Sequence, residues 1–344
     1  MMSINLKQRN SSIELYRIIA TFTVLVVHFN GWFVGGMPEK FDLTNPTIFR
    51  TGQMIIEAAT CICVNMFLII SGYFGIRLKM SSVIRLCLLL VLIYVPFYFA
   101  QLMIWGGHFF LGNLISKILV ISNAGYFIQG YLMLMFFSPV LNSFVEKYGS
   151  KILPWVTLFV GIEFWFETIR GIDNFGFNHG YSVIHFVLMY MIARCIALFK
   201  DYLTRIPKSY WIMGYFTCTV IICAMYILDV KFTFDYSNPI VVLSTICSFI
   251  PFLYKVYYNR IVNWIAGGTL AVYIIQVTNP AYQILVKLDN YFLENYSYSF
   301  YLLICGLVIF LTFSFCVLYQ KACEIIVSQV LNKLPDFIKK IELK

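Results

Sequence analysis

Ten apolar stretches of about 20 residues divide this chain, and they restrict its fold more than any other feature. A helix rises about 1.5 Å per residue, so about 20 apolar residues can cross the roughly 30 Å hydrocarbon core of a bilayer. With 60% hydrophobic and only 12% charged residues, the chain has too few polar residues for a soluble globular protein. We therefore expect an all-α polytopic membrane protein, a single domain over residues 1–344 with about ten transmembrane helices. The predicted spans are residues 13–35, 52–75, 83–105, 125–145, 152–168, 180–199, 210–228, 237–256, 262–286 and 298–320.

The basic residues predict the orientation of these spans. If the N-terminus is cytoplasmic, the loops on the opposite side hold only six of the 25 Lys and Arg residues. Those six are Lys40, Arg50, Lys117, Arg170, Lys231 and Lys287. Because positive charge concentrates in cytoplasmic loops, both termini are expected in the cytoplasm, which requires an even number of spans. Residues 1–11 then form a polar cytoplasmic N-terminus and residues 321–344 a basic cytoplasmic tail.

Charge and metal-binding residues exclude several classes of function. The net charge of +9 is spread over short loops, so we expect no nucleic-acid partner. All ten cysteines lie in or beside predicted spans without a Cys-x-x-Cys pair, which is typical of small apolar packing residues. The four histidines show no zinc-like spacing, so we expect no metal site.

The first apolar stretch carries two ionisable residues, Arg17 and His28, that a lipid-facing helix would exclude. Their spacing is three helical turns plus about 20°, so both side chains leave the same face about 16 Å apart along the axis. Separately, Arg17 could extend to the cytoplasmic headgroups and His28 could be a hydrogen-bonded packing residue. Their shared face favours a functional site inside the bundle. Glu14 could pair with Arg17 or complement the helix dipole.

The cytoplasmic end of the second span is the next informative segment. Ser71, Gly72 and Tyr73 place a small residue and a flexible backbone there. The cations that follow are Arg77, Lys79 and Arg85. Glycine near a helix end can be a C-cap or a packing notch, and basic residues are expected in an inner loop. Together, however, these residues favour a phosphate-bearing ligand at the cytoplasmic mouth.

The densest polar group on the outer side lies at the end of the fifth span and in the following loop. Its members are Glu163, Glu167, Arg170, Asp173 and His179. Carboxylates there could bind sugar hydroxyls, or they could belong to a solvated loop.

Other polar residues give weaker signals. Tyr131 lies near the outer end of the fourth span, where tyrosine usually belongs to the interfacial belt. His185 and Arg194 lie on opposite faces of the sixth span, half a turn apart, and so do not form a second pair. Residues 106–124 are amphipathic and predict a helix in the membrane interface.

These motifs resemble the integral-membrane acyltransferase-3 family, whose members acylate cell-envelope glycans and related acceptors. The family signature of Arg, ten residues and then His matches Arg17 and His28 in ELYRIIATFTVLVVHF. FLIISGYFG resembles the family's Ser-Gly-aromatic segment, and YFIQGYLMLMFFSPVLN and NRIVNWIAGGTLAVYIIQ are similar to two further segments. Many members end the last segment in Tyr-Leu-Ile-His, whereas this chain has Gln276 at the position of that histidine. The second histidine of those members therefore has no counterpart in this chain.

The resemblance implies a membrane-bound O-acyltransferase that uses acetyl-CoA as co-substrate, with no permanently bound cofactor. His28 would be the catalytic base or a transient acyl carrier, because a neutral imidazole can accept a hydroxyl proton. The donor would bind to Arg17, Arg77, Lys79 and Arg85. Supporting residues would be Glu14, Ser71, Gly72, Tyr73 and Tyr131. The acceptor side would be Glu163, Glu167, Asp173 and His179.

The expected partners are membrane lipid, the acyl-CoA donor and a glycan acceptor, in a bacterial inner membrane. The alternative is a transporter or flippase of a polysaccharide intermediate, in which Arg17 and His28 line a pathway. It requires broken helices in matched halves of the chain, and the sequence indicates none. A receptor or scaffold would need a large recognition loop or tail, and no predicted loop is long enough.

Overall fold

The computed structural model describes residues 9–118, 125–172 and 176–343. These residues are almost entirely helical, and six helical segments among them are long and apolar enough to cross a membrane. The six are Ser11–Val34, Ile48–Phe74, Met80–Trp105, Tyr126–Glu167, Lys208–Ile227 and Tyr298–Lys333. Shorter apolar helices lie at Val183–Leu198, Pro239–Phe252 and Arg260–Ile275. A mainly helical chain with almost no strand and with six helices of membrane-crossing length among the described residues is confirmed, while ten crossings and cytoplasmic termini stay predictions.

The elements follow one another with short connections. The first half of the chain contains α1 (Ser11–Asn30), η1 (Trp32–Val34), α2 (Ile48–Thr60), α3 (Cys63–Phe74), β1 (Leu78–Lys79), α4 (Met80–Trp105), α5 (Leu111–Ile118), α6 (Gly125–Tyr148), η2 (Gly149–Ile152), α7 (Leu153–Phe164), the π-helical turn η3 (Trp165–Ile169) and η4 (Asn178–Gly180). The second half contains α8 (Val183–Leu198), α9 (Lys200–Leu203), α10 (Lys208–Ile227), α11 (Pro239–Phe249), η5 (Ile250–Phe252), α12 (Arg260–Ala266), α13 (Thr269–Ile275), α14 (Ala281–Asn295), α15 (Tyr298–Lys333), α16 (Asp336–Lys340) and β2 (Glu342–Leu343).

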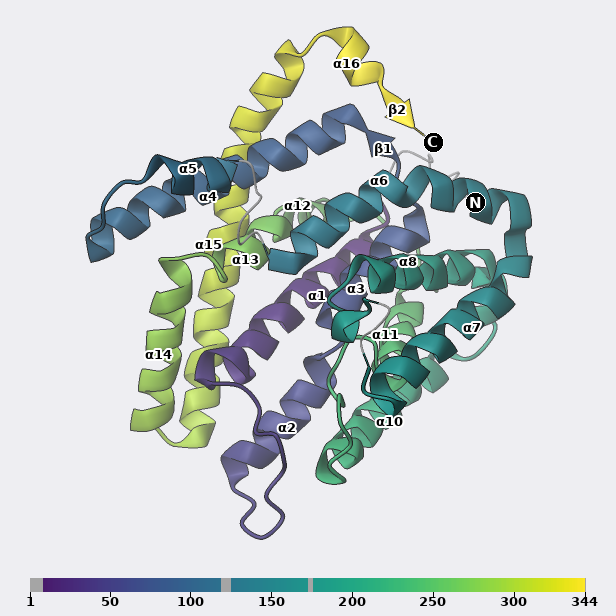
Figure 1. Ribbon diagram of the computed structural model, residues 1–344, viewed down its shortest axis with the longest axis vertical. Coiled ribbons are helices and arrows are strands. Elements are labelled where there is room, and N and C mark those ends of the chain that lie inside the picture. The colour runs from purple at the N-terminus through teal and green to yellow at the C-terminus, as the bar shows by residue number, and fades with distance from the viewer. Residues whose placement is uncertain (1–8, 119–124, 173–175, 344) are drawn as a thin grey trace.

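Helix α1 occupies the centre of the bundle (Figure 1) and packs against α2, α3, α12, α13 and α15. The Asn10 side chain caps it by accepting a hydrogen bond from the Ser12 N–H at 3.1 Å. Glu14 lies in its first turn, where a carboxylate complements the helix dipole. Ser11 is buried and donates to the Asn263 side chain at 2.9 Å. The first turn of α1 is thereby fixed to α12.

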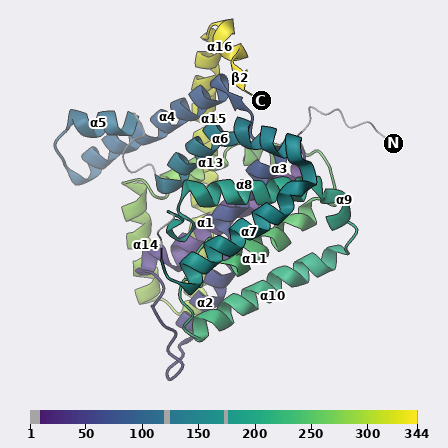
Figure 2. The same ribbon diagram turned by 45° about the vertical axis from the view of Figure 1, so that its right-hand side comes forward.

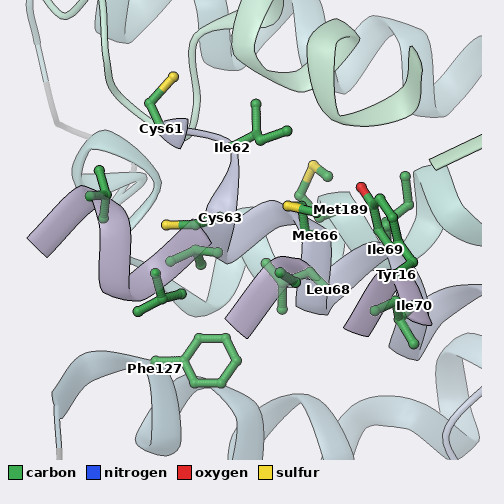
Figure 3. Close-up of a cluster of buried hydrophobic side chains, with 14 of the residues drawn as sticks. Tyr16, Cys61, Ile62, Cys63, Met66, Leu68, Ile69, Ile70, Phe127 and Met189 are labelled. Carbon is green, nitrogen blue, oxygen red and sulfur yellow. The ribbon is translucent and has the colours of Figure 1, made fainter. Parts of the chain in front are cut away.

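Two helices beside α1 are interrupted. The break between α2 and α3 lies at Cys61 and Ile62, and Figure 3 shows both residues beside the buried side chains of α3. The break between α12 and α13 lies at Gly267 and Gly268. A Cβ on Gly268 would lie 2.8 Å from a methyl carbon of Val317, so glycine allows close packing against α15. The predicted span 262–286 is therefore not one continuous helix.

Helices α4 and α5 extend from the bundle as a pair (Figures 1 and 2). The Tyr98 hydroxyl joins them by donating to the Phe110 carbonyl at 3.3 Å. Leu111 and Ile115 of α5 expose more than 40% of their surface, as an interfacial helix requires. The helix predicted within residues 106–124 is confirmed for Leu111–Ile118, and residues 119–124 lie outside the described part of the chain.

The C-terminal segment returns to the end of the bundle at which α1 begins (Figure 1). Strand β2 pairs antiparallel with β1, with Leu78 opposite Leu343 and Lys79 opposite Glu342. The tail therefore lies beside the basic segment that follows α3.

The contact between α3 and α8 generates a stability prediction at Gly72. A Cβ on this residue would lie 2.6 Å from both the Ala193 Cβ and the Tyr190 carbonyl oxygen. We expect Gly72→Ala to destabilise the protein by about 1–3 kcal/mol, because the two helices must move apart. The thermal denaturation midpoint in detergent measures this effect. Gly306→Ala is the matched control, since nothing lies within 4 Å of a Cβ there; equal midpoints for the two variants would contradict the prediction.

Candidate functional site

His28 lies near the end of α1, where a glutamine fixes its imidazole. Its Nδ1 is 3.1 Å from the Oε1 atom of Gln276, a fully buried side chain that follows α13. The ring also makes an edge contact with Trp32 at 4.9 Å between centroids. An amide oxygen only accepts hydrogen bonds, so the tautomer that satisfies this contact has the proton on Nδ1 and the lone pair on Nε2. Within the described residues Nε2 has no protein hydrogen-bond partner, which is the arrangement a general base requires.

A cavity of about 210 Å³ lies between α1, α3, α4, α6 and α13. Arg17, Ser71 and Tyr131 line it together with apolar side chains. The Ser71 hydroxyl lies 3.5 Å from the Tyr131 hydroxyl. Arg17 Nε is 3.4 Å from a carboxylate oxygen of Glu14, the partner that the sequence analysis considered. The structure thus brings four of the candidate residues together in and beside one cavity.

Helix α13 connects this cavity with His28. Tyr273 lines the cavity, and Gln276 lies one helical turn further along, a rise of about 4.5 Å. His28 itself is not among the lining residues. Since α1 is continuous from Ser11 to Asn30, Arg17 and His28 lie at two depths on one face, about 16 Å apart along the axis.

The three consecutive residues of the Ser-Gly-Tyr segment have different surroundings. Only Ser71 lines the cavity, while Gly72 packs against α8. The Tyr73 ring lies 5.4 Å from Phe249, and its carbonyl accepts a hydrogen bond from Arg194 at 3.4 Å. Successive helical residues point about 100° apart, so three in a row cannot line one wall.

Of the three predicted donor-binding cations that follow α3, two already have acidic partners, as Arg17 has in Glu14. Lys79 Nζ is 3.1 Å from Glu342, and Arg85 Nη2 is 2.8 Å from Glu324. Arg77 is exposed and forms no ion pair within the described residues. The sequence analysis missed both glutamates because they follow the cations by more than two hundred residues in the chain.

The predicted acceptor group on the outer side divides into two sites. Glu163 turns inward, with Oε1 2.8 Å from His185 Nδ1. His185 Nε2 is 2.9 Å from Asn65 Oδ1, and all three side chains are fully buried. Glu163 is therefore a core residue and not part of a solvated loop, while its place on the acceptor side stays a prediction. No local pattern in the sequence indicates this triad, since its members come from α3, α7 and α8.

Glu167 and His179 belong to the second of these sites. The Glu167 carboxylate accepts a hydrogen bond from the His179 backbone N–H at 2.7 Å. His179 Nδ1 lies 2.9 Å from Asp235, a residue that the sequence analysis missed, and the ring stacks on Phe232. Asp173 lies outside the described residues. This site contains two carboxylates and one imidazole in a half-buried loop cluster.

No protein-family model, curated protein or solved structure matches this chain. Among the described residues, no group of three or more His, Cys, Asp or Glu side chains is arranged to hold a metal ion. The function must therefore be argued from the residues themselves, chiefly His28 with Gln276 and the cavity beside Arg17.

The Asp235 site generates a prediction about pH. Burial raises the pKa of Asp235 from 3.8 to about 6, although His179 opposes the shift. The Asp235 carboxyl group therefore binds its proton more tightly in the folded protein than in the unfolded chain. The protonated carboxyl group favours the folded state, and this contribution to the free energy of unfolding is lost as pH rises from about 4 to above 6. We expect the thermal denaturation midpoint of the wild type to fall relative to that of Asp235→Asn over this interval. Parallel pH profiles for the two proteins would refute the prediction.

Proposed function

We propose that this chain is a membrane-embedded O-acyltransferase. It would transfer an acyl group, acetyl in the simplest case, from acyl-CoA to a hydroxyl of a cell-surface polysaccharide or of its lipid-linked precursor. The observation that carries the proposal is the hydrogen bond between His28 Nδ1 and Gln276 Oε1. This hydrogen bond leaves a lone pair on Nε2 of His28, near the C-terminal end of α1. Arg17 lines the cavity nearer the N-terminal end of the same helix. The resemblance in the first and last motifs supports the same reaction.

His28 would act as the base. Nε2 takes the proton of the acceptor hydroxyl while the hydroxyl oxygen attacks the thioester carbonyl carbon. The carbon–sulfur bond then breaks, and the leaving thiolate takes the proton from the imidazolium, so the histidine is regenerated. In the covalent variant of the proposal, Nε2 attacks the carbonyl carbon and the carbon–sulfur bond breaks, which releases the CoA thiolate. The acceptor hydroxyl then attacks the acyl-imidazole, the carbon–nitrogen bond breaks, and the hydroxyl proton goes to the thiolate. Gln276 serves both routes because it fixes the ring and its tautomer.

Arg17 would hold the donor. A guanidinium in a mostly apolar cavity binds a phosphate group strongly, since water competes poorly there. Its neighbour Glu14 is 3.4 Å away and can keep the charge paired when the donor is absent. In a bundle of ten spans with cytoplasmic termini, Arg17 would lie near the cytoplasm and His28 near the outer face. Acyl-CoA from the cytoplasm would then react with an acceptor that reaches His28 from the outer side of the membrane.

One observation favours the transporter alternative as a second candidate. The α2–α3 and α12–α13 helices are both interrupted beside α1, although the sequence indicated no broken helices. Interrupted helices of this kind line substrate sites in secondary transporters. The acyltransferase is the stronger candidate because the contact with Gln276 engages only Nδ1 and leaves Nε2 available as a base.

Binding and cleavage of acetyl-CoA by the purified protein in detergent test the two candidates. We expect His28→Ala to bind the donor and to cleave the thioester about 10²- to 10⁴-fold more slowly, because the base is lost. Arg17→Ala should weaken binding about tenfold or more, since a charged hydrogen bond to phosphate contributes about 1.5–3 kcal/mol. Lys40→Ala is the control, because Lys40 pairs with Asp229 outside the bundle. A wild type without affinity for any acyl-CoA would refute the acyltransferase and favour transport.

Gln276 gives a separate prediction about positioning. Gln276→Leu removes the oxygen that accepts from Nδ1, so the ring can rotate and change its tautomer. We expect thioester cleavage to fall about tenfold or more while acetyl-CoA binding is unchanged. Gln276→Glu keeps an acceptor at this position and should retain more activity than Gln276→Leu, with a shifted pH profile. Equal rates for both variants and the wild type would show that Gln276 has only a packing role.

A further inference from the structure

A group of cations surrounds a single carboxylate where α15 packs against α4. Glu324 lies on α15, 2.8 Å from Arg85 Nη2 and 3.9 Å from Lys321 Nζ. Arg9 lies within electrostatic range of Lys321, as does Arg85. One carboxylate cannot neutralise three cations, so this cluster has an excess of positive charge. Such an excess beside a cavity indicates an anionic ligand.

An exposed aromatic ring lies next to these cations. Lys321 Nζ is 5.5 Å from the centre of the Trp264 ring, and Trp264 exposes 47% of its surface. A flat ring beside phosphate-binding cations is the combination that binds nucleotides, because the base stacks while the phosphates pair with Lys and Arg. Lipid headgroups have no base to stack, so the cluster favours a nucleotide over an anionic lipid.

The backbone connects this cluster directly to the cavity. Leu86, next to Arg85 in α4, lines the cavity, and so do Thr269 and Leu270 at the start of α13. The Gln320 side chain, one turn before Glu324, donates to the Gly267 carbonyl at 2.9 Å and accepts from the Ala271 N–H at 2.8 Å. Helices α4 and α15 also pack against each other. The cluster and the cavity therefore share α4 and the segment that joins α12 to α13.

We propose that Trp264, Arg85, Lys321 and Arg9 form the subsite for the nucleotide end of the donor. This inference rests on the proposed acyltransferase function. The adenine ring stacks on Trp264, the phosphates bind the three cations, and the thioester arm enters the cavity toward His28. Glu324 acts as the counter-ion of the empty subsite, and the donor phosphates displace it.

Equilibrium binding of three ligands tests this subsite. The ligands are acetyl-CoA, acetyl-3′-dephospho-CoA and S-acetylpantetheine, which lacks the nucleotide. We expect Lys321→Gln and Trp264→Leu each to weaken acetyl-CoA binding about tenfold and to leave S-acetylpantetheine binding unchanged. Glu324→Gln should tighten acetyl-CoA binding, because it removes the competing carboxylate. Lys333→Gln is the control, since it removes a cation from the same helix about 18 Å away. The thermal denaturation midpoint of each variant shows that it is folded.

The outcomes separate the subsite from the proposed function. If the wild type binds acetyl-CoA but Lys321→Gln and Trp264→Leu bind it equally well, the subsite is wrong and the acyltransferase stands. If a variant binds acetyl-CoA and S-acetylpantetheine more weakly by the same factor, the subsite is also wrong, because the lost contact would not be with the nucleotide. If the wild type binds none of the three ligands, both proposals fail. If Lys321→Gln weakens the binding of acetyl-3′-dephospho-CoA less than it weakens the binding of acetyl-CoA, the 3′-phosphate binds at Lys321.

Discussion

The need to pair buried histidines with side chains from other helices determines much of this structure. In an apolar bundle an unpaired polar or charged group costs several kcal/mol, so the ionisable residues of the helices decide how the helices pack. His28 on α1 requires Gln276 after α13, and His185 on α8 requires Glu163 on α7 and Asn65 on α3. The triad around His185 fixes three helices against one another. The pair at His28 leaves one nitrogen free for chemistry, and this difference separates the structural histidine from the candidate catalytic one.

The central helix and the interrupted helices beside it explain how a polar site can exist in such a bundle. Continuous α1 holds Arg17 and His28 at fixed depths, whereas the break at Gly267 and Gly268 lets α13 start inside the bundle. Helix α13 then places Tyr273 at the cavity and Gln276 at His28. Non-helical backbone at this depth is tolerated because protein surrounds it. The same glycines allow α15 to approach, which brings Lys321 beside the break between α12 and α13.

Charge is distributed unevenly over the ends of the helices. Near the start of α1, the acidic residues Glu14, Glu324 and Glu342 each pair with a cation. The half-exposed pairs of Glu324 with Arg85 and Glu342 with Lys79 contribute little to stability, so they can exchange partners with a ligand at low cost. The buried pair of Glu163 with His185 cannot do so, because separating it would leave an uncompensated charge in the core. Burial therefore distinguishes the ion pairs that can open for a ligand from those that hold the fold.

The sequence by itself determined the local properties of the chain. Apolar runs predicted the helices, and the helical period placed Arg17 and His28 on one face, because both properties depend on neighbouring residues. The sequence also identified Arg17, Ser71 and Tyr131, which the structure brings together at one cavity. Only the tertiary structure decided which residues from distant segments pair. It assigned Gln276 to His28, turned Glu163 into the core, joined Asp235 to His179 and placed Glu324 beside Arg85. Such pairs depend on how helices pack in three dimensions, and the period of a single helix carries no information about its neighbours.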